Sequence, residues 1–179
     1  MTHPPIRQRR SIRLQGYDYT LPGAYFITIC TFERQLLFDV LKYQQVVHNQ
    51  WFASASIRPE LRLDAFVVMP NHVHGIVWIT ETDVRERLPV GAQGLAPLPQ
   101  QPSKPHVTPR SLGAFVRGFK SAVTREVNAL RRTPGTPVWQ RNYYEQVVRT
   151  DDELNNIRQY IVDNPRKWQE DENNPANLP

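Results

Sequence analysis

The stretch Val67-Val68-Met69-Pro70-Asn71-His72-Val73-His74-Gly75-Ile76-Val77 decides the fold of this chain. Apolar residues lie on both sides of a Pro-Asn pair. Proline at the first central position of a turn and asparagine at the second are typical of a tight reversal of the chain. The sequence therefore predicts a β-hairpin whose first strand ends at Met69 and whose second runs from His72 to Ile79.

The two histidines of this stretch stand two residues apart on the predicted second strand. Alternate side chains of a strand point to the same face, so both imidazoles would face one point while Val73 faces the core. A strand can present two nitrogen ligands to one metal ion in this way. Spacing alone leaves a second interpretation open, in which both are structural histidines bonded to backbone carbonyls.

Hydrophobic periodicity and capping signals predict the remaining elements. The last helix carries a capping box formed by Thr150 and Glu153, and it should end near Asn164 because Pro165 follows. Thr108 is the expected N-cap of the helix before it, with Pro109 at its first position. The full set comprises a strand at 24–32, a helix at 41–57, the hairpin, a helix from 109 to about 132, a strand at 139–148 and the last helix.

This order of elements predicts an α+β fold of the ferredoxin-like, or split βαβ, type. Its antiparallel sheet would have about four to five strands backed by helices. We expect one domain at 24–168, with a basic arm at 1–23 before it and an acidic tail at 169–179 after it. Residues 81–108 are rich in proline and would form either a mobile loop or an ordered flap.

Composition points to a polyanionic partner, with nucleic acid as the first choice. The chain has 179 residues and a formal net charge of +5, and four arginines with no acid occupy its first thirteen residues. No apolar run approaches the length of about 18 residues that spans a membrane, and we expect no signal peptide. The single cysteine, Cys30, fits a reducing cytoplasm and reads as a buried spectator thiol.

Tyr160 and Asn164 lie four residues apart on the last helix and therefore on the same face of it. An amide oxygen there could add a hard ligand to two imidazoles, and a phenol one turn earlier would lie close to the same ion. A tyrosine at the margin of a helix is more often a packing residue, so the residues alone leave the role of Tyr160 open.

His-Val-His after Val-Val-Met-Pro-Asn, together with Asn-Asn-Ile-Arg-Gln-Tyr-Ile-Val-Asp-Asn-Pro at 155–165, resembles the HUH single-strand transposases. Within them the chain most resembles the REP-associated tyrosine transposases and their insertion-sequence relatives with one catalytic tyrosine. The segments Arg-Leu-Gln-Gly-Tyr-Asp-Tyr at 13–19 and Trp-Gln-Arg-Asn-Tyr-Tyr at 139–144 are also similar. The resemblance covers roughly residues 10–168.

The resemblance implies roles for individual residues. His72 and His74 match the metal-binding pair, Asn164 matches the third ligand position, and Tyr160 matches the nucleophile. The implied activity is cleavage and rejoining of single-stranded hairpin DNA through a 5′-phosphotyrosine, with Mg²⁺ or Mn²⁺ as the cofactor. Some relatives act as homodimers that donate the tyrosine helix in trans and others act as monomers, and the sequence does not choose between them.

Basic and aromatic residues are candidate contacts for the DNA. Trp139, Tyr143 and Tyr144 would either stack on unpaired bases or pack in the sheet. The candidate phosphate contacts are Arg7, Arg9, Arg10, Arg13, Arg117, Lys120 and Arg141. Two other functions remain open: a metal-dependent hydrolase that uses water, and a non-catalytic DNA-binding regulator of hairpin repeats.

Overall fold

The computed structural model describes residues 17–80 and 110–177. The four arginines of the arm, the proline-rich segment 81–108 and the end of the expected tail lie outside the described residues. The strands are β1 (Gly23–Cys30), β2 (Leu61–Met69), β3 (His72–Ile79) and β4 (Tyr144–Val148). The α-helices are α1 (Leu41–Ser56), α2 (Leu112–Arg131) and α3 (Asp151–Asp163). Short 3₁₀ helices lie at Phe32–Arg34, Leu37–Asp39, Asn164–Glu170 and Pro175–Asn177.

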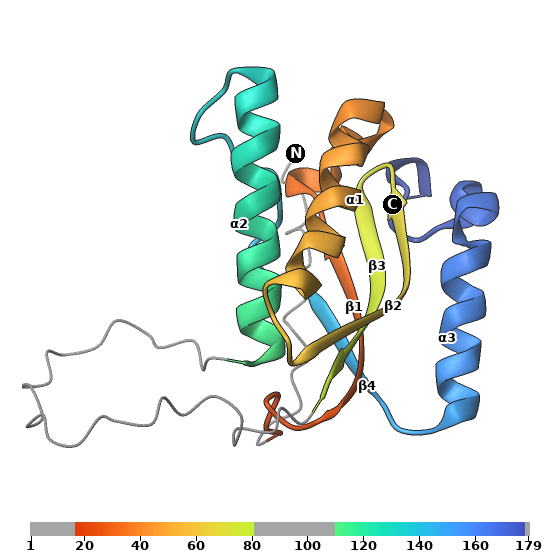
Figure 1. Ribbon diagram of the computed structural model, residues 1–179. Helices are drawn as coiled ribbons and strands as arrows, with labels where there is room; N and C mark the ends of the chain where they lie inside the picture. The colour runs from red at the N-terminus through yellow and green to blue at the C-terminus, as the bar shows by residue number, and fades with distance from the viewer. Residues whose placement is uncertain (1–16, 81–109, 178–179) are drawn as a thin grey trace, which may run out of the picture.

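The four strands form one antiparallel sheet in the order β2-β3-β1-β4. Helices α1 and α2 lie against one face of the sheet, and α3 lies against the other (Figure 1). Each face has its own apolar core, so the fold has three layers. The predicted α+β class and the antiparallel sheet backed by helices are confirmed. None of the helices within the described ranges has the length and apolar character that a membrane span requires.

The predicted hairpin is confirmed, with Met69 paired to His72 and only Pro70 and Asn71 between the strands. Gly75 follows on β3 and lies under the ring of Trp51 from α1. A Cβ atom built on Gly75 would come within 2.5 Å of that ring. Glycine therefore lets α1 pack directly on the strand that carries the two histidines, which buries Trp51 completely.

The predicted start of α2 is wrong. The N-cap is Ser111, whose hydroxyl accepts a hydrogen bond from the Ala114 N–H at 3.2 Å, and not Thr108. Arg110 has a φ of 59°, in the left-handed region, and Ser111 is extended, so no helix passes through these two residues. For α3 the predicted cap is confirmed, because the Thr150 hydroxyl accepts from the Glu153 N–H at 3.1 Å.

The fourth strand is shorter than predicted. Pairing of β4 with β1 begins at Tyr144, and Trp139 forms only an isolated bridge with Thr31. The Trp139 ring packs in the core against Phe38 and Phe119, with centroid distances of 5.1 and 5.9 Å. The alternating pattern at 139–148 thus reflects two different packing environments and not one continuous strand.

Candidate active site

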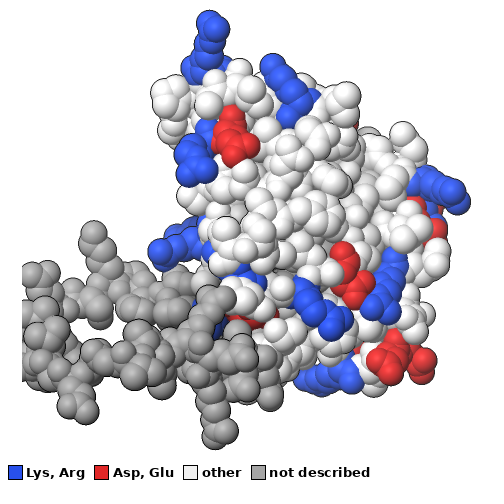
Figure 2. Space-filling view, in the orientation of Figure 1, with Lys and Arg blue, Asp and Glu red and all other residues white. Residues whose placement is uncertain are grey.

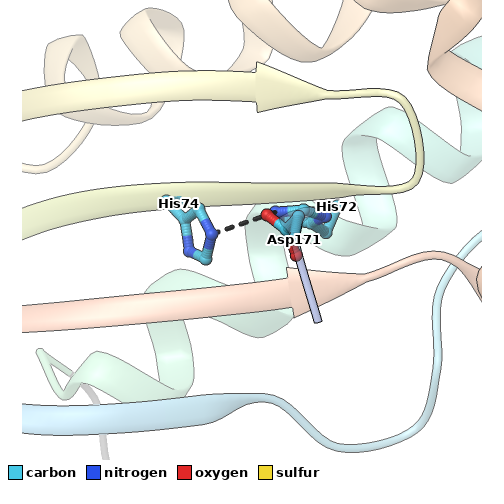
Figure 3. Close-up of side chains that lie close together, drawn as sticks. All are labelled: His72, His74 and Asp171. Carbon is cyan, nitrogen blue, oxygen red and sulfur yellow. Dashed lines mark hydrogen bonds and ion pairs between the residues drawn. The ribbon is translucent and has the colours of Figure 1, made fainter. Parts of the chain in front are cut away.

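His72 and His74 lie at the start of β3, and both are almost completely buried, at 0% and 2% exposure. Their side chains share the sheet face that α3 covers, and the two Nε2 atoms are 2.9 Å apart (Figure 3). Two ligands that each lie about 2.1 Å from one ion at right angles would be about 3 Å apart. The two imidazoles therefore have the spacing of neighbouring ligands in an octahedral metal site.

Asn71 determines which nitrogen of His72 carries the proton. Its amide nitrogen donates to the backbone oxygens of Arg34 at 3.1 Å and Asn173 at 2.7 Å, so its Oδ1 faces His72 Nδ1 at 2.8 Å. An amide oxygen only accepts, and His72 Nδ1 must therefore carry hydrogen. The Nε2 lone pair of His72 is consequently directed at His74, ready for a proton or a cation. Hydrogen bonds of this kind orient metal-binding histidines in many proteins.

His74 has a matching partner on the neighbouring strand. Its Nδ1 lies 2.8 Å from the Thr28 hydroxyl, which can donate or accept. When that hydroxyl accepts a hydrogen bond from Nδ1–H, the Nε2 atom of His74 also carries a lone pair. The lone pairs of the two Nε2 atoms then face each other. This separation is favourable only when the two atoms share a proton or a cation. Phe26 stacks on the imidazole at a centroid distance of 5.4 Å and fixes its plane.

Burial keeps both imidazoles neutral at pH 7. Desolvation lowers the pKa of His72 to about 3, and the nearby charge of Arg34 acts in the same direction. The pKa of His74 is also lowered to about 3, mainly by desolvation and then by His72, while Asp171 opposes the shift. Neutral imidazoles are the form that binds metal, so the pair is ready to bind at neutral pH.

These lowered pKa values predict that the metal-free protein loses stability in acid. The unfolded chain takes up protons at its histidines below a pH of about 6.5, whereas the folded pair stays neutral until about pH 3. Stability therefore falls as the pH drops through this window, by about 1.4 kcal/mol per unit for each histidine. Between pH 6.5 and 5 we expect a loss of about 3 kcal/mol in urea unfolding, in the presence of a chelator.

The matched control for this experiment is the double variant His72→Gln/His74→Gln. Its unfolding free energy should change much less over the same range, because neither glutamine titrates. An equally steep pH dependence in the variant would show that other groups control the acid sensitivity.

Two further buried residues, Asn164 and Asp171, offer candidate oxygen ligands. Asn164 is 3% exposed, and its Oδ1 finds no hydrogen-bond partner among the described residues. Asp171 places Oδ2 3.7 Å from His72 Nε2, and the ligand atoms of His72, His74 and Asp171 all lie within 4.8 Å of one another. A buried acceptor without a donor is costly unless a cation or water satisfies it. This donor set of nitrogen and hard oxygen fits a divalent metal ion.

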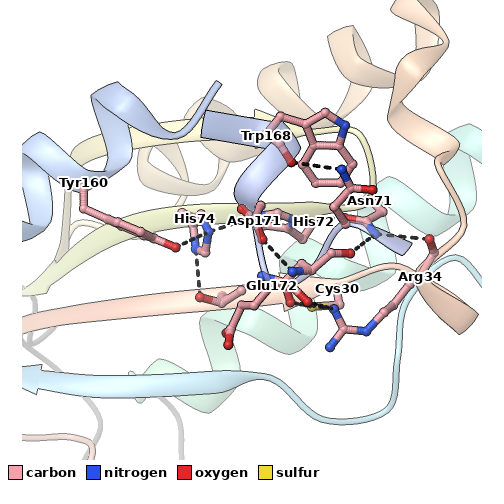
Figure 4. A network of polar contacts seen from close by, with 12 residues as sticks. Cys30, Arg34, Asn71, His72, His74, Tyr160, Trp168, Asp171 and Glu172 are labelled. Carbon is pink, nitrogen blue, oxygen red and sulfur yellow. Dashed lines mark hydrogen bonds and ion pairs between the residues drawn. The ribbon is translucent and has the colours of Figure 1, made fainter. Parts of the chain in front are cut away.

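Tyr160 extends from α3 toward the same cluster (Figure 4). Its hydroxyl lies 3.3 Å from His74 Nε2, while 45% of the residue remains exposed. Burial raises the pKa of the phenol, the charge of Asp171 adds to the rise, and a hydrogen bond from Asn164 acts against it. Tyr160 is therefore a protonated phenol at neutral pH that contacts both the histidine cluster and solvent.

Two comparisons with known proteins concern the whole chain and its fold. No profile of a known protein family matches the chain. A protein of Haemophilus influenzae, described as an uncharacterized protein, is 38% identical over an alignment of 175 residues that covers 93% of each chain. The chain belongs to the family of that protein. The similarity between the two proteins thus extends over nearly the whole length of each chain.

The fold is also that of a solved transposase. The structure of a REP-associated tyrosine transposase bound to a REP hairpin superposes with a TM-score of 0.60 over 85% of this chain and 72% of that chain. The two sequences are 20% identical in this alignment. The fold that the sequence resemblance implies is confirmed by this comparison.

Asp171 and Asn173 lie in the segment 169–179, for which the sequence predicts only an acidic tail and no part in the site. The 3₁₀ helix Asn164–Glu170 turns the chain back after α3, so that Asp171 lies beside His72 and Asn173 bonds to Asn71. Cys30 also contacts this segment, with Sγ 3.7 Å from Asn173 Oδ1. Three consecutive acids gave no signal that the middle one is buried, at 9% exposure.

The predicted DNA contacts fall into different environments. Arg117 and Arg141 are exposed, whereas the Lys120 ammonium donates to the backbone oxygens of Gln140 and Arg141. Lys120 therefore holds a backbone segment in place and is not a free surface charge. Burial lowers its pKa to about 8.

The aromatic residues predicted to contact DNA also lie in different environments. Trp139 is a core residue at 7% exposure, and Tyr143 is half-buried against the same core. Tyr144 is 40% exposed and contacts Phe26 at a centroid distance of 6.3 Å. Tyr160 contacts the same Phe26 ring at 6.1 Å, and His74 stacks on that ring, so both tyrosines lie near His74. Of Trp139, Tyr143 and Tyr144, only Tyr144 has an exposed ring near the histidine cluster.

The amide of Asn71 offers a direct test of the site. Asn71→Ala removes the acceptor that orients His72, and we expect Mn²⁺ affinity to fall by about 10- to 100-fold in calorimetric titration. The control is Asn49→Ala on α1, where an exposed asparagine accepts from Gln45. Unchanged affinity in folded Asn71→Ala would show that this bond does not prepare His72 for metal.

Proposed function

We propose that this protein is a metal-dependent transposase that cleaves and rejoins single-stranded hairpin DNA through a 5′-phosphotyrosine. One observation carries the proposal: the Tyr160 hydroxyl lies 3.3 Å from His74 Nε2, within a cluster whose donors suit a divalent ion. A nucleophile and a metal site in contact are what phosphoryl transfer to a tyrosine requires. The motif resemblance and the shared transposase fold support the same function.

The metal would be held by the Nε2 atoms of His72 and His74, with oxygen from Asn164, Asp171 or both. Mixed nitrogen and oxygen donors with open positions suit Mg²⁺ or Mn²⁺. When bound, such an ion supplies charge that polarises a phosphate oxygen and favours the phenolate form of a nearby tyrosine. The unpartnered Oδ1 of Asn164 is the donor in this set with the most to gain from a cation.

Tyr160 would attack the phosphorus of the scissile phosphodiester. A bond forms between the phenolic oxygen and phosphorus, and the bond to the 3′ oxygen of the preceding nucleotide breaks. The phenolic proton passes to solvent, to which Tyr160 is exposed, and the departing 3′ oxygen takes up a proton from solvent. The energy of the broken bond is kept in the phosphotyrosine, so a different 3′-hydroxyl can reverse the step and join a new strand without ATP.

The arrangement of Tyr160 suggests that one chain suffices for cleavage. Its hydroxyl reaches His74 of its own chain, and α3 is held to β2 by Arg158, which forms a two-point ion pair with Asp64. Trp78 donates to the same Asp64 carboxylate at 3.0 Å. We therefore favour a monomer with its tyrosine in cis over a homodimer that exchanges the helix.

The DNA partner would be a single strand that carries a hairpin, and the transposase of the same fold is bound to a REP hairpin. Arg117 and Arg141 are exposed cations that could bind its phosphates, and the arginines of the arm, at positions 7, 9, 10 and 13, remain candidates. Tyr144 has the exposure and position to stack on a base next to the scissile phosphate. Such stacking contributes about 1–3 kcal/mol per base.

The test is a search for the covalent intermediate. Labelled single-stranded hairpin DNA, taken from the sequences that flank the gene, is incubated with the protein and Mg²⁺ or Mn²⁺ and run on a denaturing gel. We expect a protein–DNA band that disappears in chelator, with the nucleotide mapped by peptide mass spectrometry to Tyr160. Cleavage without an adduct would instead indicate a hydrolase that uses water, and tight binding without cleavage would indicate a DNA-binding regulator.

A further inference from the structure

A hollow of about 800 Å³ lies between the second half of α2 and the segment 134–141 that follows it. In Figure 1 this segment leaves the end of α2 and returns toward β4. The hollow lies on the face of the sheet opposite to the histidine cluster. None of the residues that line it belongs to the cluster, so it is a separate surface.

All of the charged side chains that line this hollow are basic. Its lining includes Lys120, Arg125, Arg132 and Arg141 and, within the described chain, no aspartate or glutamate. The three arginines are exposed and form no ion pair with any described carboxylate. Figure 2 shows basic side chains that project into solvent around the end of α2. A concave surface lined by one sign of charge attracts a polyanion.

The walls of the hollow are held in place before anything binds. Lys120 Nζ donates to the backbone oxygens of Gln140 and Arg141, which fixes one end of the segment to α2. Asn128 and Arg131 both donate to the Thr136 oxygen, at 2.9 and 3.0 Å, which fixes the other end. A preformed surface binds with little loss of conformational entropy.

One end of the hollow lies close to the candidate active site. Gln140 donates its N–H to the Cys30 oxygen at 2.9 Å, and Cys30 is paired across the sheet with His72. A strand of DNA that leaves the hollow past Gln140 therefore emerges at the end of the sheet that carries the cluster. Apolar surface from Ala129, Pro137 and Val138 lies beside the cations in the same hollow.

We infer that this hollow binds the single-stranded DNA that flanks the hairpin and guides it to Tyr160. Cations combined with apolar surface are typical of sites for single strands, whose phosphates and unpaired bases are both accessible. This inference rests on the proposed function, because it assigns to that activity a further segment of its DNA.

The experiment measures DNA binding in chelator, so that no cleavage occurs. The variant Arg125→Ala/Arg141→Ala removes one cation from each wall. For a labelled hairpin with single-stranded flanks we expect about tenfold weaker binding near 50 mM salt. The slope of log affinity against log salt concentration should fall by about 0.7 for each arginine. For the same hairpin without flanks, binding should not change.

The control is Arg62→Ala, which removes an equally exposed cation from β2 at the opposite edge of the sheet. It should bind both DNAs as the wild type does. Equal losses with and without flanks would overturn the assignment to the single strand, and no loss with either DNA would overturn the site altogether. Because Tyr160 and metal play no part in this measurement, a failed search for the phosphotyrosine would leave its result intact, and the reverse also holds.

Discussion

Replacing Tyr160 with phenylalanine is expected to lower the single-turnover rate of DNA cleavage by about 10⁴-fold or more and to abolish the covalent adduct. Removal of a nucleophile has effects of this size in enzymes that form covalent intermediates. The variant keeps the ring, which packs against Phe26 at 6.1 Å, so folding and DNA affinity should be unchanged. Only the oxygen that lies 3.3 Å from His74 is lost.

Tyr144→Phe is the matched control for this substitution. Tyr144 contacts the same Phe26 ring, at 6.3 Å, and its hydroxyl donates to Gln146 and not to the cluster. We expect cleavage by Tyr144→Phe to stay within about threefold of the wild type, because stacking needs only the ring. Cleavage that persists in Tyr160→Phe would assign the attack to water.

The second large effect is expected for His72→Ala. With one imidazole gone, calorimetry should show Mn²⁺ affinity at least about 100-fold weaker, since loss of a ligand exceeds the loss caused by its hydrogen-bond partner. Cleavage should fall by about 10³-fold or more, because the phosphate loses the charge that stabilises its transition state. DNA binding in chelator should persist.

His48→Ala provides the control for the loss of an imidazole. His48 is exposed on α1 and stacks on Phe52 at a centroid distance of 4.8 Å, away from the cluster. It should match the wild type in metal affinity and cleavage. Wild-type metal affinity in His72→Ala would place the ion elsewhere, and a folded His72→Ala that still cleaves at the normal rate would separate the activity from this cluster.

Local signals in the sequence account for most of the fold. The hairpin at Pro70–Asn71 and the cap at Thr150 depend on residues within a few positions of one another, and both are confirmed. The start of α2 was misplaced because Thr108-Pro109 carries the standard signal, yet the left-handed φ of Arg110 directs the cap to Ser111. The presence of an arginine in the sequence does not predict that its backbone adopts a left-handed φ.

In the candidate site, too, local patterns of the sequence predict some residues and not others. Strand periodicity places His72 and His74 on one face, and helical spacing places Tyr160 near Asn164. The position of Asp171 depends on how a 3₁₀ helix turns the chain after α3, and the local hydrogen bonds of Asp171 and Asn174 that hold this turn do not indicate that it ends beside His72. The sequence does not predict that Asn71 orients His72, because an asparagine after Pro70 is already accounted for by the turn.

The hydrogen bond from Asn71 to Asn173 spans 102 positions of the chain and has a consequence for biosynthesis. On the ribosome the hairpin can form early, since its strands are neighbours in sequence. The contacts that close the site, from Tyr160, Asp171 and Asn173, come from residues made much later. A nascent polypeptide therefore carries paired histidines without Tyr160, so the proposed cleavage of DNA would become possible only after nearly all of the described chain has been translated.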